Sequence, residues 1–390
     1  MKITRRAFAS FLVLSAAFGA LLPAQTADKP SAKKSYLAFV GTYTTKTASK
    51  GIYAFRYDAS SGKLTPIGAA AETADPSWVA IHPNGKFLYA VSEAGKNSMV
   101  SAFALNRQSG KLTLLNQLPA LGEDPCYLSF DRRGKYAFVA NYTSGNVVVF
   151  PIEADGKLGA ATANVRDEGT LGPNKERQEG PHAHWIESSP DNRYVLVSDL
   201  GLDEILVYPF DASSGAFAKD SYNKVGHVST DAGSGPRHLA FLADRWVFSV
   251  NELKSTVTWF LYDPLRDGLS KLSTVSMLPK GFSGRNDAAE IALHPNGKFL
   301  YSSNRGHDSI ALFHIDAATG KLTSAGDFSV EGKEPRHFAI DPHGKFLLAE
   351  DQLSDKIVTF RIDQKNGALT PTGDSVKVPS PVCLAFLALE

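Results

Sequence analysis

The chain has 390 residues, of which 43% are apolar and 21% are charged, and its formal net charge at pH 7 is +1. That much apolar material can bury a large core, and closed all-β folds routinely exceed the usual single-domain length. The even charge balance argues against a nucleic-acid partner, because phosphate binding needs a basic surplus on one face.

The first residues have the features of an export signal. The sequence TRRAF at residues 4–8 leads into an apolar run that ends at Leu22, and small residues follow. We predict a twin-arginine type signal peptide over residues 1–27, a flexible leader over residues 28–35, and a periplasmic or secreted protein free of the membrane after cleavage. An uncleaved membrane anchor is the alternative, but the apolar run is short for a bilayer span.

A repeated sequence pattern decides the fold class. IHPNGKFLY at residues 81–89 returns almost unchanged as LHPNGKFLY at residues 293–301. Around each copy lie a proline, a short apolar run, the turn, an aromatic run and a third apolar run. These units recur about every fifty residues, which is typical of a repeat architecture. They begin near Pro76, Pro125, Pro181, Pro236, Ala288 and Pro335.

Each unit contains four runs with the composition of β-strands, bounded by Gly, Asn and Pro turns. In the first full unit these are residues 78–81, 87–92, 99–105 and 112–115. Four antiparallel strands form one blade, and a blade buries both of its faces only when copies pack around an axis. An open β-solenoid is the alternative, but it would show stacked identical rungs.

The two ends of the chain complete the ring. Residues 36–40, 51–57 and 64–67 supply only three strands of a first blade, and residues 382–389 match the inner strand of the other units. We therefore predict an all-β, seven-bladed β-propeller over residues 36–390, with four antiparallel strands per blade and the C-terminal strand joining the N-terminal blade. A closed ring has no free edges, so we expect a monomer.

Two cysteines and two repeated histidines have structural interpretations. Cys126 and Cys383 fall on inner strands of blades that are not neighbours, so we expect free buried thiols and no disulfide. His82 and His294 belong to the repeated turn and are interpreted as structural.

The starts of the inner strands and the ends of the second strands converge at the mouth of a propeller channel. Aligning the units therefore gives two sets of residues that are expected to face one another there. The inner-strand starts are Ser77, Cys126, His184, Arg237, Ala289, Arg336 and Val382. The second-strand ends are Tyr43, Glu93, Tyr142, Leu200, Glu252, Arg305 and Gln352.

Polar residues concentrate in units four to six, where His182, His184, Arg237, Glu252 and Arg305 fall. Two guanidinium groups match a carboxylate or phosphate, and a His and a Glu beside them can exchange protons or direct water. The alternatives are structural. Arg237 and Glu252 could form a salt bridge across a blade, and the two histidines could be packing or capping residues.

Other chemistries lack their sequence motifs. The chain has no Gly-x-Ser-x-Gly elbow, no glycine-rich phosphate loop before a helix, and no cysteine pair spaced for zinc. We therefore expect neither a metal nor a cofactor.

Several longer stretches carry a family resemblance. They are PNKERQEGPHAHW at 173–185, GPRHLAF at 235–241, NEL at 251–253, NDAAEI at 286–291 and SNRGHDSI at 303–310. Together they resemble the seven-bladed propeller lactonases, a family that includes bacterial 6-phosphogluconolactonase and fungal 3-carboxy-cis,cis-muconate cyclase. The resemblance spans residues 36–389.

The resemblance implies an active group of one His, two Arg and one Glu. The matching catalytic positions are His184, Arg237, Glu252 and Arg305. His182 competes with His184 for the histidine position, and the strand count favours His184. The expected substrate-binding residues are His182, Arg336, His307 and Glu290.

What the resemblance implies is hydrolysis of a small anionic lactone. Arg237 and Arg305 would hold the anion and the developing oxyanion, while Glu252 or the histidine would activate water. The export signal favours an unphosphorylated sugar lactone or a carboxylate-bearing ring over a cytoplasmic sugar phosphate. A carboxymuconate-type cycloisomerase and a propeller that only binds a ligand are the alternatives. Whether residues 166–179 form a lid is open.

Overall fold

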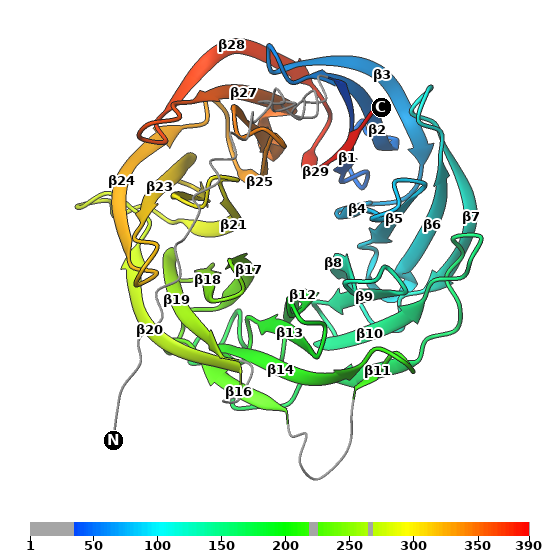
Figure 1. Cartoon of the computed structure of the whole chain (residues 1–390), viewed down its shortest axis with the longest axis horizontal. Coiled ribbons are helices and arrows are strands. Elements are labelled where there is room, and N and C mark those ends of the chain that lie inside the picture. The colour runs from blue at the N-terminus through cyan, green and yellow to red at the C-terminus, as the bar shows by residue number, and fades with distance from the viewer. Residues whose placement is uncertain (1–34, 218–224, 264–267, 390) are drawn as a thin grey trace, which may run out of the picture. The chain divides into compact units, whose positions relative to one another are not determined.

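The computed structural model describes residues 35–217, 225–263 and 268–389. The predicted signal peptide lies outside these ranges. The described residues form seven antiparallel sheets, arranged as blades around a central axis (Figure 1). This arrangement confirms the predicted seven-bladed propeller. In the same ranges, no helix is long and apolar enough to cross a membrane.

The strands of each blade follow one another from the channel outward. Blade 1 contains β29 (Pro381–Ala388), β1 (Ser35–Thr42), β2 (Gly51–Asp58) and β3 (Lys63–Glu72). Blade 2 contains β4 (Val79–Ile81), β5 (Phe87–Ser92), β6 (Met99–Leu105) and β7 (Leu112–Pro119). Blade 3 contains β8 (Pro125–Phe130), β9 (Tyr136–Asn141), β10 (Asn146–Pro151) and β11 (Ala163–Arg166). Blade 4 contains β12 (Ala183–Ser188), β13 (Tyr194–Asp199), β14 (Glu204–Asp211), β15 (Ala216–Phe217) and β16 (Gly226–Ser229).

The remaining blades follow the same plan. Blade 5 contains β17 (Pro236–Leu242), β18 (Trp246–Asn251), β19 (Thr256–Asp263) and β20 (Gly268–Ser276). Blade 6 contains β21 (Asp287–Leu293), β22 (Phe299–Arg305), β23 (Ser309–Ile315) and β24 (Leu322–Ser329). Blade 7 contains β25 (Pro335–Ile340), β26 (Phe346–Asp351), β27 (Lys356–Ile362) and β28 (Leu369–Lys377). Two short 3-10 turns, η1 (Gly95–Asn97) and η2 (Gln352–Ser354), complete the described elements.

The chain ends close the ring as predicted. β29 pairs antiparallel with β1, in a register that places Tyr36 opposite Ala388 and Val40 opposite Leu384. β1 begins at Ser35, the last residue of the predicted leader. Blade 4 has one strand more than expected, because β15 and β16 both pair with β14.

Burial between blades explains the aromatic second strands. All six residues of β9 are buried, because one face packs on blade 2 and the other on blade 4. Each buried aliphatic or aromatic side chain of this kind contributes about 1.5–3 kcal/mol relative to exposure. Neighbouring blades are also joined by the repeated turn, since His82 Nε2 donates to the Gly134 carbonyl at 2.7 Å, and His294 does the same to Gly344. These two histidines are structural, as expected.

A recurring irregularity shapes the channel. In six of the seven blades the register between the inner and second strands shifts at the start of the inner strand. Such a β-bulge interrupts the alternation of side chains, so two consecutive residues can turn toward the same space. Arg237 and His238 in β17 form one such pair, and Arg336 and His337 in β25 form another.

Candidate active site at the channel mouth

A polar cavity of about 280 Å³ opens among the inner strands and the loops above them. Most of its walls come from the inner-strand starts and the second-strand ends that the repeat alignment identified. The lining residues are Glu93, Cys126, Tyr142, Arg177, His184, Glu252, Arg285, Asp287, Arg305, Glu334 and Arg336. The cavity therefore brings together residues from six of the seven blades and from the loop before β12.

Glu252 sits at the centre of a group of arginines, one residue after β18. Its Oε1 lies 2.5 Å from Arg177 Nη2, and its Oε2 lies 3.1 Å from Arg237 Nε and 3.0 Å from Arg305 Nη2. Burial opposes the charge, but the three arginines outweigh it and lower the pKa of Glu252 to about 2. Glu252 is therefore an ionised carboxylate already paired with three guanidinium groups, and a carboxylate with so low a pKa is a poor acceptor for a water proton.

Arg237 is enclosed behind this carboxylate. Its Nη1 donates to the Ala289 carbonyl at 2.8 Å, and the side chain does not line the cavity. Burial, together with the charges of Arg305 and Arg336, lowers the pKa of Arg237 to about 10. The guanidinium thus stays cationic at neutral pH, with Glu252 as its direct counter-ion. The predicted pair of Arg237 and Glu252 does form an ion pair.

Arg305 and Arg336 both reach the cavity, but they differ in how they are held. Arg305 is bound by Glu252 and donates to the carbonyls of Asp287 and Ala288 at 3.3 and 3.2 Å. Arg336 lies over the ring of Tyr43 at 5.3 Å, and Glu93 is 3.8 Å from its Nη2. Arg336 therefore keeps more donors available for a ligand than Arg305 does.

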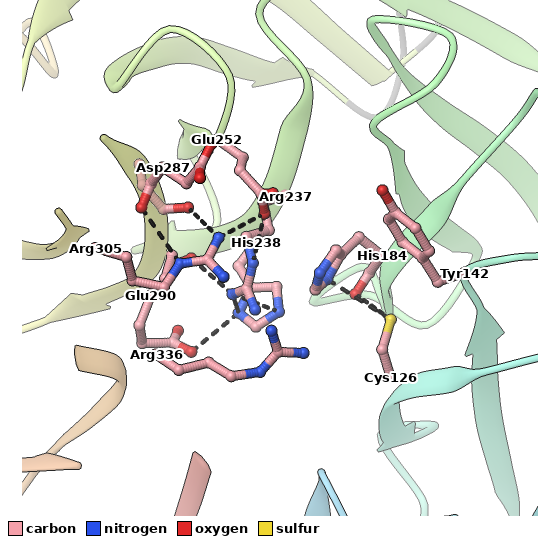
Figure 2. A network of polar contacts seen from close by, with 12 residues as sticks. Cys126, Tyr142, His184, Arg237, His238, Glu252, Asp287, Glu290, Arg305 and Arg336 are labelled. Atoms are coloured by element: carbon pink, nitrogen blue, oxygen red, sulfur yellow. Dashed lines mark hydrogen bonds and ion pairs between the residues drawn. The ribbon is translucent and has the colours of Figure 1, made fainter. Parts of the chain in front are cut away.

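Geometry separates the two candidate histidines. His184 lines the cavity, with its Nδ1 3.7 Å from Cys126 Sγ and its ring edge-on to Tyr142. His182 stacks on Tyr142 at 4.5 Å between ring centroids, donates from Nδ1 to the Tyr142 carbonyl at 2.9 Å, and lies outside the lining. Figure 2 shows the His184 ring facing the Arg237 and Arg305 group.

Burial and nearby positive charges keep His184 neutral. Burial is the largest cause, and the positive charges of Arg237 and Arg336 add to it, so the pKa of His184 falls well below its ordinary value. An uncharged imidazole has one nitrogen lone pair free to accept a proton. His184 is thus the one histidine among the described lining residues, and its neutral ring can accept a proton.

Besides His182, two more predicted substrate-binding residues lie away from the lining. His307 packs edge-on to Phe282, and its Nδ1 bonds Ser309 Oγ at 2.6 Å. Glu290 is buried further along the channel, where its Oε2 accepts from His238 Nδ1 at 3.0 Å. Of the four expected substrate contacts, only Arg336 reaches the cavity.

The main addition to the predicted site is Arg177, which sits on the loop that precedes β12. The loop is anchored, because Gln178 is buried and donates to the Leu200 carbonyl and to Asp203 Oδ1, both at 2.8 Å. Asn174 donates its backbone N–H to Gln178 Oε1 at 3.0 Å. Arg177 is therefore held over Glu252 as a fixed part of the wall.

The charges around the cavity cancel. Its cationic side chains are Arg177, Arg285, Arg305 and Arg336, and its acidic side chains are Glu93, Glu252, Asp287 and Glu334. A wall of this kind offers carboxylate acceptors for hydroxyl groups beside guanidinium donors for oxygens. Among the residues that the structure describes, no group of His, Cys, Asp and Glu is placed to hold a metal ion.

Comparison with known proteins places this chain in a family. Residues 37–386 match the family described as "Lactonase, 7-bladed beta-propeller". The 6-phosphogluconolactonase of Bacillus subtilis (strain 168) is 35% identical over 353 residues, which are 90% of this chain and 98% of that protein. The 6-phosphogluconolactonase of Formosa agariphila is 33% identical, across 77% of this chain and 85% of that protein. The structure of the Pseudomonas aeruginosa periplasmic gluconolactonase PpgL is 34% identical, with a TM-score of 0.84, and covers 91% of this chain and 100% of that one. The chain belongs to the seven-bladed β-propeller lactonase family.

Proposed function

We propose that the protein hydrolyses a small sugar-type lactone in the channel-mouth cavity. The observation that carries the proposal is the pairing of a neutral histidine with guanidinium groups across one small cavity, at His184, Arg305 and Arg336. The relatives named as lactonases support the reaction class. The export signal predicted from the sequence and the periplasmic relative support a location outside the cytoplasm.

In the proposed mechanism, His184 acts as the general base. It takes a proton from water, and the hydroxide adds to the lactone carbonyl carbon. The resulting oxyanion is stabilised by Arg305 and Arg336, whose charges act in a largely enclosed site. The tetrahedral centre then collapses, the ring C–O bond breaks, and His184 returns its proton to the departing alkoxide. The product is the open-chain hydroxy acid.

From the sequence, either Glu252 or the histidine is expected to activate water. In this scheme Glu252 has a different role. Its carboxylate holds Arg177, Arg237 and Arg305 in one arrangement, and it stays charged across the physiological range. We therefore assign the base to His184 and the orientation of the arginines to Glu252. Arg237, which lies behind the lining, fixes Glu252 rather than the substrate.

The balanced charge of the cavity favours an uncharged or singly charged lactone. A phosphate ester carries nearly two negative charges at neutral pH, and it would meet Glu93, Asp287 and Glu334 as well as the arginines. The hydroxyl groups of an aldonolactone can instead donate to those carboxylates while the carbonyl oxygen faces Arg305 or Arg336. Glucono-type lactones therefore fit the site better than their phosphorylated forms.

The test is proton release by the purified protein in a pH-stat, with glucono-δ-lactone and 6-phosphogluconolactone as substrates. We expect faster turnover of the unphosphorylated lactone, and loss of that turnover in His184→Gln. Product analysis by NMR separates hydrolysis from cycloisomerisation, because only hydrolysis consumes water. Absence of hydrolysis across a panel of sugar lactones would refute the proposal.

A further inference from the structure

A second layer of side chains closes the channel directly behind the cavity, one residue further along the inner strands. Its residues, which we call the plug, are Trp78, Tyr127, His238, Glu290 and His337. The ring of Trp78 lies 5.4 Å from both imidazoles, and Tyr127 lies 5.0 Å from His238, so contacts cross the axis from blades 2 and 3 to blades 5 and 7.

Polar contacts link one side of the plug into a chain. Glu350 Oε2 lies 2.5 Å from His337 Nδ1, and His337 Nε2 lies 3.6 Å from Glu290 Oε2. The same Glu290 oxygen accepts from His238 Nδ1 at 3.0 Å. Glu290 Oε1 accepts the backbone N–H of Ile291 at 3.0 Å. Both oxygens of Glu290 thus receive donors, which suits an ionised carboxylate.

A second titratable pair, His337 and Glu350, lies next to Glu290. Glu350 is fully buried, and its Oε1 has no partner among the described residues. Burial and the nearby Glu290 carboxylate raise the pKa of Glu350 well above its usual value. Burial lowers the pKa of His337, and the two shifts together favour a protonated Glu350 beside a neutral His337, a pair with no net charge.

Glu290 lies behind the cavity, near the arginines Arg237 and Arg336. Arg237 Nη1 lies 3.3 and 3.5 Å from the two ring nitrogens of His238, so the guanidinium rests against the imidazole that Glu290 binds (Figure 2). Burial raises the pKa of Glu290, whereas the charges of His337, Arg237 and Arg336 oppose that shift and favour the carboxylate form. Glu252 pairs with Arg237 from the cavity side.

We propose that Glu290 is a specificity-determining residue, which lowers the affinity of the cavity for anions by serving as the buried counter-charge of Arg237 and Arg336. His238 and His337 hold Glu290 in place. The pair formed by His337 and Glu350 fills the space behind it. This inference rests on the proposed function for the identity of the substrate. It explains how a cavity with several arginines can favour an unphosphorylated lactone. Glu290 acts through neighbouring groups and touches no substrate.

The test uses three variants that preserve the size or the charge of the side chain. Glu290→Gln removes the charge but keeps an acceptor for His238, and Glu290→Asp keeps the charge. Glu350→Gln changes the carboxyl group at the other end of this series of polar contacts. Calorimetric binding of inorganic phosphate to the intact mature protein is measured for each. We expect Glu290→Gln to bind phosphate about tenfold more tightly than the wild type, as one uncompensated charge in a buried site implies. We expect the other two variants to stay within about twofold of it.

Activity provides the second measurement. The ratio of kcat/KM for 6-phosphogluconolactone to that for glucono-δ-lactone should rise in Glu290→Gln alone. A purely structural role of Glu290 would weaken binding of both ligands together and would lower the melting temperature. Equal or weaker phosphate binding by Glu290→Gln overturns the inference. Phosphate binding can be measured without turnover. If the wild-type protein hydrolyses no lactone, the proposed function is refuted, and the binding measurements still test the role of Glu290.

Discussion

The two halves of the channel differ sharply in chemistry although their backbones are alike. At the start of the inner strands, blades 1 to 3 present apolar or weakly polar residues. These are Val382 and Cys383, Ser77 and Trp78, and Cys126 and Tyr127. Blades 5 to 7 present mostly charged or titratable residues. These are Arg237 and His238, Ala289 and Glu290, and Arg336 and His337.

This contrast shows how a symmetric scaffold hosts an asymmetric site. The propeller supplies seven nearly equivalent positions, and chemistry arises from the side chains that occupy about half of them. The apolar half also has an electrostatic effect, because Trp78 and Tyr127 exclude water from the imidazoles opposite. Charges in such a dry environment interact more strongly than charges at a surface.

The largest effect should follow from removing the proposed base. We expect His184→Gln to lower kcat by a factor of about 10²–10⁴, the usual contribution of general base catalysis, with little change in melting temperature. The matched control is His182→Gln, which alters a histidine outside the lining. Because His182 is not the proposed base, kcat should fall no more than about tenfold. Comparable losses in both variants would contradict the assignment of the base to His184. Steady-state kinetics in a pH-stat distinguishes the outcomes.

A pair of variants tests the two halves directly. Arg305→Ala removes an oxyanion contact and should lower kcat about 10²–10³-fold. Ser77→Ala makes a small change at an inner-strand start in the apolar half, where the buried Ser77 Oγ has no partner among the described residues. Its activity should stay within about twofold of the wild type. A loss in Ser77→Ala as large as that in Arg305→Ala would show that the halves contribute alike.

Glu252 should affect stability more than any other residue of the cavity. Its pKa of about 2 in the folded protein lies below the ordinary 4.5, so its stabilising effect is complete above pH 4.5 and fades as the pH falls toward 2. Glu252→Gln leaves three buried or half-buried arginines without their carboxylate and should cost about 3–5 kcal/mol. Urea unfolding at pH 7 and pH 3 measures this. A difference that is as large at pH 3 as at pH 7 would argue against the ion pairs as its source.

A smaller effect is expected where blade 7 departs from its neighbours. Asp351 ends β26 at the position that Asn141 and Asn304 occupy in blades 3 and 6, where their side-chain amides donate to backbone carbonyls. Burial raises the pKa of Asp351 to about 8, although Lys356 opposes the shift. The folded protein therefore retains this proton, whereas the unfolded chain loses it near the ordinary 3.8, so stability falls as the pH rises from about 4 to about 8.

Asp351→Asn supplies a permanent donor at that position. We expect the variant to match the wild type near pH 4 and to be more stable at pH 9, by about 1 kcal/mol or more. Thermal unfolding at the two pH values provides the measurement. If the variant is no more stable than the wild type at pH 9, neighbouring groups such as Lys356 already stabilise the ionised Asp351 carboxylate.

The periodic features of the molecule could be predicted from the sequence. The repeated HPNGK turns revealed the blades, and the match of residues 382–389 to inner strands revealed the ring closure. Aligning the repeats also identified most of the cavity wall, including His184 and Arg336. That succeeded because equivalent positions in a closed ring must converge on one axis.

The parts that escaped prediction break the period. His238 and His337 were missed because strict alternation allows one residue in two to face the channel, whereas the bulge admits two in succession. The repeated Pro-Arg-His at 236–238 and 335–337 was the available signal. Arg177 lies on a loop outside the repeat, and its contact with Glu252 depends on tertiary anchoring through Gln178. No local pattern encodes such a contact.

The pairing of β29 with β1 also bears on the order of events in folding. Tyr36 can pair with Ala388 only after all the residues between them have been synthesised, so the strand that seals the first blade is the last strand of the propeller to be made. Until then, β1 offers an open edge and the ring cannot close. Pairing across such a sequence separation is slow compared with local hairpin formation. A route that carries folded proteins, such as the predicted twin-arginine type signal would provide, lets this final pairing take place in the cytoplasm before export.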